Sequence, residues 1–263
     1  TPLRYSEVLE LNQSSLQAAG LLSWFPIGHY RDGRNLATYK LPRRAAAEVN
    51  VGGVVTHGHR RGVQFPGSGT NSHYVFLDGA GMYYGPIRGT NEFSLFMWIN
   101  AAAIGSVLTA FSQGGGWIQL RVEADGKLGC SVDGYSVFES SATLSANTWY
   151  HIGVTSVGTS QKLYINGIQD GSASQTPAVS SAGHISEGRI GAHNGGSTPW
   201  NGLLDDLRIY NRTLSDAEVL TVYNETRDGG YGDLAAKTQR FYNIPFTAAE
   251  EDTSEPTVIV NKQ

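Results

Sequence analysis

The sequence predicts an all-β protein: a two-sheet antiparallel β-sandwich, with one short helix on its C-terminal side and an extended arm at each end. Three observations predict this fold. Many short apolar segments follow one another at close spacing. Tight-turn pairs such as Asp125-Gly126, Asp133-Gly134 and Asn166-Gly167 separate several of them. A single helix-start signal appears, late in the chain.

The length and composition of the chain restrict the classes of protein to which it can belong. The chain has 263 residues, 33 of them Gly, a formal net charge of -4 and one cysteine. This length fits one large β domain or two small ones, and the charge predicts no affinity for nucleic acid. Cys130 lies in a strand-like context and is expected to be a small buried apolar residue. No apolar run approaches the roughly 20 residues of a membrane helix, and the first residues do not have the pattern of a signal peptide.

The stretch from Trp200 to Glu218 organises the rest of the chain. Strand alternation predicts one face with Leu203, Asp205, Leu207 and Ile209, and an opposite face with Asp206, Arg208 and Tyr210. On that prediction Asp205 ties a loop to the strand, because a buried carboxylate needs partners, and Asp206 forms an ion pair with Arg208. Ser215 and Glu218 have the spacing of a capping box, which predicts that a helix begins there.

A family resemblance rests on the same stretch. Its pattern, Trp-x-Gly-x-Leu-Asp-Asp-Leu-Arg-Ile-Tyr-Asn-Arg-x-Leu-Ser-x-x-Glu, resembles the closing motif of the concanavalin A-like lectin/glucanase superfamily, in its laminin-G-like branch. Residues 20–27, 93–100, 147–155 and 162–171 resemble earlier segments of that branch. The resemblance implies a two-sheet antiparallel sandwich of the jelly-roll kind over about residues 20 to 226. It does not imply one function, because lectins, glycosidases and structural modules share the fold.

The expected organisation has three parts. Residues 1–19 form an N-terminal arm, with a helical turn over residues 6–11, and residues 20–226 form the laminin-G-like domain. Residues 29–62 of that domain are a basic, irregular insert, and residues 227–263 form a C-terminal extension. The insert is interpreted either as a solvated loop face or as a docking surface for an acidic partner or an anionic glycan.

Assembly contacts are predicted in the basic insert and in the C-terminal extension. Arg43, Arg44, Arg60 and Arg61 belong to the insert, and the tail carries the acidic residues Glu250, Glu251 and Asp252. The two groups are complementary in charge, as subunits that associate often are. The β-prone run that contains Val258, Ile259 and Val260 has the composition of a segment that adds a strand to a neighbour's sheet.

A metal cofactor is not predicted. In calcium-binding relatives, acidic side chains supply oxygen ligands near the turn after residue 65, and this chain has Pro66 and His73 at the two corresponding positions. Calcium requires several carboxylate or carbonyl oxygens, so calcium binding is disfavoured.

A catalytic role is not predicted either. Glycosidases need two carboxyl groups that flank the scissile bond, and the resemblance implies that they would lie on one strand as Glu-x-Asp-x-Glu. The nearest stretch, Glu123-Ala-Asp125-Gly-Lys127, lacks the last carboxylate, and Asp125-Gly126 is typical of a turn. Asp205 and Asp206 are neighbours on a strand, so they are expected to point to opposite faces.

A glycan-binding site would need an exposed aromatic ring and neighbouring polar groups. The candidates are Trp117, Tyr83, Tyr84, His193, Asn194 and Trp200.

The sequence therefore predicts a non-catalytic structural or recognition protein that acts within an assembly, such as a phage capsid decoration or surface protein. Its expected partners are other protein subunits, in a homo-oligomer or a surface lattice, and its expected location is a virion surface or the cell exterior. The segment after the helix, with Glu225-x-Arg227, resembles laminin-G-like proteins carried by phages. A calcium-independent lectin that binds cell-surface glycans is the alternative, and a glycoside hydrolase is a more distant one.

Overall fold

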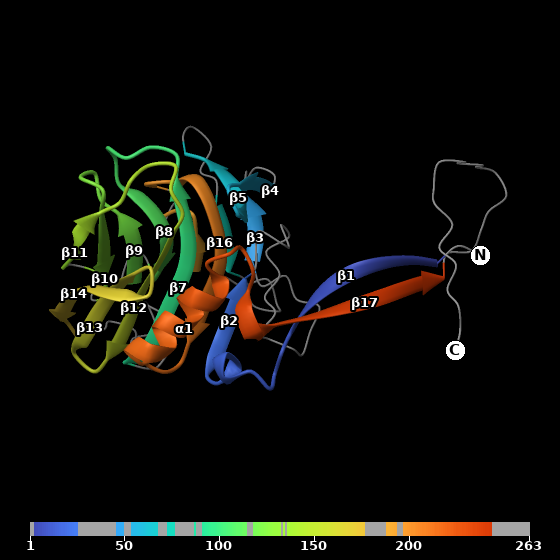
Figure 1. Ribbon diagram of the computed structural model, residues 1–263. Helices are drawn as coiled ribbons and strands as arrows, with labels where there is room; N and C mark the ends of the chain where they lie inside the picture. Colours follow the sequence, from blue (N-terminus) through green and yellow to red (C-terminus); the bar gives the residue numbers. More distant parts are fainter. Residues whose placement is uncertain are drawn as a thin grey trace.

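The predicted fold is confirmed by the computed structural model, in which two antiparallel sheets pack as a sandwich (Figure 1). The structure describes residues 3–25, 46–49, 54–67, 73–76, 87, 91–114, 118–132, 134, 136–176, 188–193 and 197–243. Among these residues, no helix is long and apolar enough to cross a membrane.

The first sheet has eight strands and carries the central strands of the molecule. Its order is β14 (Ile168–Ser174), β13 (Ser160–Ile165), β12 (Tyr150–Val157), β7 (Glu92–Ala101), β16 (Asn201–Tyr210), β5 (Arg60–Pro66) and β4 (Val54–His57), with β2 (Leu21–Phe25) also paired to β16. The first half of β16 pairs with β5, from Asn201 to Leu204, and its second half pairs with β2, from Leu207 to Tyr210. The neighbour of β16 therefore changes at Asp205 and Asp206.

The second sheet has seven strands. Its order is β11 (Phe138–Thr143), β10 (Lys127–Ser131), β9 (Ile118–Val122), β8 (Leu108–Gln113), β15 (Gly188–Ile190), β6 (His73–Phe76) and β3 (Ala46–Val49). The insert predicted to be irregular over residues 29–62 therefore contributes β3, β4 and the start of β5. That prediction was wrong in part, because charged residues such as Arg60 and Arg61 lie on a paired strand.

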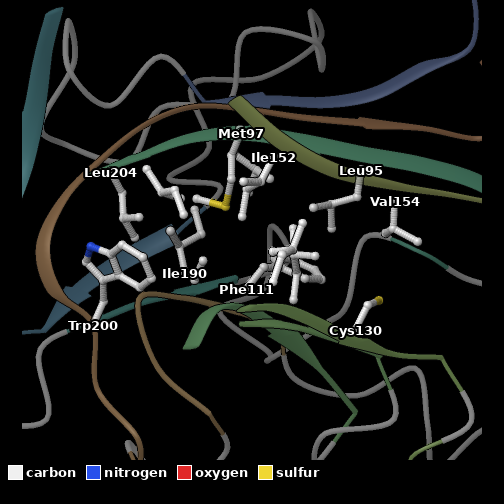
Figure 2. Close-up of a cluster of buried hydrophobic side chains, with 14 of the residues drawn as sticks. Leu95, Met97, Phe111, Cys130, Ile152, Val154, Ile190, Trp200 and Leu204 are labelled. Atoms are coloured by element: carbon white, nitrogen blue, oxygen red, sulfur yellow. The ribbon is translucent and has the colours of Figure 1, made fainter. Parts of the chain in front are cut away.

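The core fills the space between the sheets. Leu95, Met97, Ile152, Val154 and Leu204 enter it from the eight-stranded sheet, as Figure 2 shows. Phe111, Cys130 and Ile190 enter it from the other sheet. Cys130 is fully buried, as its strand context predicted, and burial raises the pKa of its thiol. An uncharged, buried thiol is a packing residue and not a nucleophile.

The strand β7 is apolar on both faces because both faces are covered. Phe93, Leu95 and Met97 face the core between the sheets. Phe96 and Trp98 face outward, where helix α1 (Asp216–Thr226) covers them. The capping box of Ser215 and Glu218 forms at the start of this helix. The buried stripe of α1 consists of Val219, Val222 and Thr226, whereas the side chain of Leu220 is exposed.

The two arms form one element. The strand β1 (Leu3–Leu11) pairs antiparallel with β17 (Ala235–Asn243), and we call this two-stranded sheet the terminal ribbon. Figure 1 shows that it extends away from the sandwich. The helical turn predicted over residues 6–11 was wrong, because pairing with a strand more than 200 residues away in sequence replaces local helix formation.

Close packing of the central strands generates a stability prediction at Gly153. A Cβ atom at this position of β12 would lie 2.0 Å from Cδ1 of Phe96 and 2.6 Å from the Leu95 carbonyl oxygen. The Phe96 ring cannot swing away, because it is fully buried and stacks on His151. We expect Gly153→Ala to lower the free energy of unfolding by about 1–3 kcal/mol, the usual cost of overpacking.

Urea denaturation, monitored by tryptophan fluorescence, measures this loss of stability. Gly230→Ala is the matched control, because its Cβ would find its nearest neighbour at 3.9 Å, so its effect should stay within about 0.5 kcal/mol. Equal stabilities for the two variants would contradict the prediction.

Candidate functional site at the root of the terminal ribbon

A bulge in β16 creates the site. Asp205 lies opposite Trp98 of β7, but the next aligned pair is Arg208 with Phe96, so β16 has one extra residue between them. Asp206 takes the left-handed backbone conformation, with φ of 51°, which Asp tolerates better than most residues. The extra residue reverses the alternation along the rest of the strand.

The faces predicted for β16 were therefore wrong in part. Leu204, Leu207 and Ile209 face the core between the sheets. Leu203 instead joins Trp98 and Trp149 on the outer face. Strict alternation would place Asp205 and Arg208 on opposite faces, but both lie on the outer face. Each takes part there in one of two neighbouring ion pairs.

The first ion pair joins Asp205 to Arg60. Nη1 of Arg60 lies 2.7 Å from Oδ2 of Asp205, and both side chains are almost completely buried. The guanidinium group of Arg60 also lies over the Trp98 ring, 4.4 Å from its centroid, and donates hydrogen bonds to the carbonyl oxygens of Thr226 and Gly230. The hydroxyl of Tyr231 donates to Oδ1 of Asp205 at 3.2 Å. Asp205 thus ties the segment after α1 to the sheet.

The second ion pair joins Asp206 to Arg208. Nε of Arg208 donates to Oδ1 of Asp206 at 3.0 Å, and Nη2 lies 2.9 Å from Oδ2. The Trp24 indole donates to the same Oδ1 at 2.8 Å, and Nη2 of Arg208 donates to the Tyr231 carbonyl oxygen at 2.7 Å. Arg208 also donates to the side chain of Gln17, which itself donates to Glu225. We call Trp24, Arg60, Asp205, Asp206, Arg208 and Tyr231 the buried anchor.

The buried anchor holds both strands of the terminal ribbon. Trp24 is fully buried and packs against Leu11, where β1 ends, and against Ala235, where β17 begins. The Tyr231 ring meets Trp24 edge-on, with 5.8 Å between centroids. Asn12 donates to the carbonyl oxygen of Asp233 at 2.9 Å, which joins the two chain segments just below the ribbon. The root of the ribbon is therefore fixed to the sandwich.

A second cluster of charged groups lies on the outer face of the seven-stranded sheet. Arg121 pairs with Glu123 and donates to Gln119, and the Gln119 amide donates to Thr109. At the adjoining hairpin, Nζ of Lys127 lies 3.4 Å from Asp125 and 3.3 Å from Glu139. The Lys127 backbone N–H bonds to Asp125 and lowers the pKa of its carboxyl group, as expected for a turn residue. Each of these carboxylates thus has a basic partner.

The residues predicted for glycan binding are only partly described. Trp117, Tyr83, Tyr84 and Asn194 lie outside the described residues. His193 is half-buried, with Nδ1 3.1 Å from the Ser197 hydroxyl. The prediction for Trp200 was wrong, because its side chain is fully buried in the main core, where Figure 2 also shows it, and cannot stack on a sugar.

The residues predicted for assembly contacts are also only partly described. Eight of them lie outside the described residues: Arg43, Arg44, Glu250, Glu251, Asp252, Val258, Ile259 and Val260. Arg61 is exposed on β5. The prediction for Arg60 was wrong, because this residue is fully buried and its charge is engaged by Asp205.

Sequence reasoning missed Gln17, Trp24 and Tyr231 as members of one network. The available signal was the Trp24 indole, because a buried N–H needs an acceptor. No group of His, Cys, Asp or Glu residues in the described part of the chain has an arrangement that could hold a metal ion.

Comparisons with known proteins agree with this architecture. A family model described as the concanavalin A-like lectin/glucanases superfamily, in its laminin-G branch, matches residues 68–220, and the chain belongs to this family. A search of curated proteins finds no match.

Several solved structures share the fold of this chain at low sequence identity. Domain 4 of an extracellular arabinanase from Geobacillus stearothermophilus, solved with arabinotriose, is 16% identical with a TM-score of 0.58, and the match covers 76% of this chain and 96% of that one. A sialidase from Trypanosoma rangeli is 14% identical with a TM-score of 0.57, and the match covers 81% of this chain but 34% of the sialidase. The chain therefore spans about a third of the sialidase chain. A heptameric pentraxin from Limulus polyphemus is 18% identical with a TM-score of 0.50, and the match covers 68% of this chain and 92% of that one.

Two buried charges generate a stability prediction. Asp205→Asn should leave the Arg60 charge buried without a counter-charge, so it should lower the free energy of unfolding by about 3–5 kcal/mol. The double variant Arg60→Met/Asp205→Asn should lose less than the sum of the two single variants, because it removes both charges. Urea denaturation of the two single variants and the double variant measures this interaction energy.

The matched control is the pair of Arg121 with Glu123, whose side chains are 22% and 13% exposed. Arg121→Met should cost less than Arg60→Met, because partial solvation screens that pair. Strict additivity at Arg60 and Asp205 would contradict the prediction.

A pH prediction follows from His151, which lies on the outer face of β12 between Phe96 and Trp98. Burial, together with the charges of Arg208 and Arg60, holds the pKa of His151 well below its ordinary value. The unfolded chain therefore binds a proton at this residue below about pH 6.5, whereas the folded chain does not. The free energy of unfolding should fall as the pH drops through and below about 6.5, by at most ~1.4 kcal/mol per pH unit for this one group.

Denaturation of the wild type and His151→Phe across this pH range measures the effect. The variant should have a shallower pH dependence by about one proton, while His59→Gln, at an exposed histidine, should keep the wild-type slope. Parallel curves for the wild type and His151→Phe would show that this histidine does not set the pH dependence.

Proposed function

We propose that the chain is a non-catalytic structural and recognition protein that acts within a larger assembly, to which the terminal ribbon connects the sandwich. The observation that carries this proposal is the buried anchor. Four charged side chains, Arg60, Asp205, Asp206 and Arg208, are almost completely buried where the ribbon begins. Charges in such positions are costly to desolvate but fix geometry when they are paired. An anchor of this kind fixes the orientation of the ribbon relative to the sandwich.

The charge distribution supports the non-catalytic part of the proposal. A glycosidase requires two carboxyl groups about 5–10 Å apart on either side of an accessible sugar. Asp205 and Asp206 are each 1% exposed and are paired with arginines, which leaves them no access to a substrate. Glu123, Asp125 and Glu139 are bound to Arg121 or Lys127. These pairings favour a structural role for the acidic residues.

An ordered surface array is the kind of assembly that suits this architecture. A sandwich held at one end by a ribbon can be displayed outward while the ribbon enters the array. The outer surface of a virion is one such array, and an extracellular lattice is another. Regular arrays repeat one contact in every copy.

Glycan binding without calcium is the second candidate function. The partly exposed ion pair of Arg121 and Glu123 on the outer face of the seven-stranded sheet favours it, because sugar hydroxyls bind to such donors and acceptors. The similar arabinanase domain was solved with arabinotriose. Cell-surface glycans would be the ligands, and Pro66, exposed at the end of β5, supplies no oxygen ligand from its side chain for calcium.

Hydrolysis and binding assays on the full chain test these functions. We expect no release of reducing sugar from arabinan or β-glucan, and no cleavage of a fluorogenic sialoside, above the rate in buffer. The reason is that Glu123, Asp125, Glu139, Asp205 and Asp206 are each engaged by a basic group. Turnover that Glu123→Gln removes and Glu225→Gln retains would overturn the non-catalytic proposal.

Titration calorimetry with arabinotriose, with and without a chelator, separates the two candidates. Heat of binding that survives chelation and disappears in Arg121→Ala would favour the glycan-binding candidate. Absence of binding to arabinotriose and to a glycan array would leave recognition of protein subunits as the function.

A further inference from the structure

The terminal ribbon continues for nine register pairs, from Leu3 with Asn243 to Leu11 with Ala235, without a bulge. At about 3.4 Å per residue, its length is about 30 Å. Within the described part of the chain it is a sheet of its own, to which neither sheet of the sandwich adds a strand. Isolated two-stranded ribbons are marginally stable in water at best. A ribbon of this length therefore calls for a further partner.

The register separates the ribbon residues into two sets. Directly opposite residues share a face, so the odd-numbered set contains six apolar residues, Leu3, Tyr5, Leu9, Leu11, Ala235 and Phe241, together with Glu7, Lys237, Gln239 and Asn243. The even-numbered set is more polar: it contains Arg4, Ser6, Glu10, Thr238 and Arg240 together with Val8, Ala236 and Tyr242. Leu11 and Ala235, at the root of the odd set, pack on Trp24 of the buried anchor. Apolar positions of the odd set continue outward from that contact, interrupted by Lys237 opposite Leu9 and by Glu7 opposite Gln239.

The two strands of the ribbon also differ in charge. The strand β1 contains Glu7 and Glu10 against one Arg4, whereas β17 contains Lys237 and Arg240 and no acidic residue. If β17 of one copy pairs antiparallel with β1 of another copy, a basic strand meets an acidic one. Opposite charges on neighbouring strands stabilise such pairing, whereas like charges oppose it. This complementarity is built into a single chain, so a second copy supplies it without any other protein.

An exposed apolar side chain lies at the root of the ribbon. Leu16 lies in the short helix η1 (Leu16–Ala18), which follows β1 and packs against η3 (Gly232–Leu234) before β17. Its side chain is 87% exposed, which makes it the most exposed large apolar residue in the described part of the chain. A neighbouring copy docked along the ribbon would reach this residue.

We infer that the terminal ribbon is a self-assembly element, in which β17 of one copy pairs with β1 of a second copy and the odd-numbered apolar positions become buried between copies. This inference rests on the proposed function and names the partner: another copy of the same chain. The pairing is head-to-tail, so rotation around an axis along the ribbons would close it into a ring without free strand edges. All sandwiches would then lie at one end of the ribbons.

Light scattering after size exclusion, with the full chain across a dilution series, tests the inference. The wild type should be larger than a monomer, and Tyr5→Lys/Phe241→Lys should be a monomer, because two basic residues then replace the two aromatic residues of the odd set. The matched control, Ser6→Lys/Thr238→Lys, adds the same charge to the even set and should remain associated. Circular dichroism and the thermal midpoint should be the same for both variants, since the sandwich does not depend on these positions.

Several results would overturn the inference. A monomeric wild type would do so, and so would equal dissociation of the two lysine variants. If Ile259→Lys dissociates the assembly while Tyr5→Lys/Phe241→Lys does not, the C-terminal segment is the contact and the ribbon is not. None of these results bears on hydrolysis, so failure of this inference is distinguishable from failure of the non-catalytic proposal.

Discussion

The structure depends on the extra residue in β16 at Asp206. With strict alternation, Asp205 would share a face with Leu207 and Ile209, and a carboxylate would enter the apolar core. The bulge reverses the alternation between Asp205 and Arg208, so Leu207 and Ile209 pack between the sheets while the charged residues serve the outer face. A single backbone irregularity thus lets a central strand contribute both to the core and to a buried polar network.

The position of this bulge along β16 explains what the network does. Here the neighbour of β16 changes from β5 to β2, and the charged residues fill the junction between them. Arg60 of β5 and Trp24 of β2 reach the two aspartates from either side, and Tyr231 closes the network from the segment after α1. Buried ion pairs seldom stabilise a fold more than apolar packing would, so their value here is geometric. They fix the position of the ribbon's root, where β1 ends and β17 begins.

Local patterns predicted the parts of the fold that depend on local sequence. Strand alternation, the hairpin turns and the capping box of Ser215 with Glu218 led to a sandwich with a late helix, which the structure confirms. Two features could not be predicted this way. The bulge leaves no trace in the alternation of residue types, and only the tolerance of Asp206 for positive φ accompanies it. The pairing of β1 with β17 joins segments at opposite ends of the chain, so residues 3–11 alone cannot specify it.

The division between shared and particular features follows the match to the family model. Asp205, Asp206 and Arg208 lie within residues 68–220, which the family model covers. Their partners Gln17, Trp24, Arg60 and Tyr231 lie outside that range, as does the whole terminal ribbon. In this chain, acidic residues of the common framework are thus bound by elements that the family model does not describe. Since the fold alone does not define a function, the part of this protein that does is expected where those additional elements meet the framework.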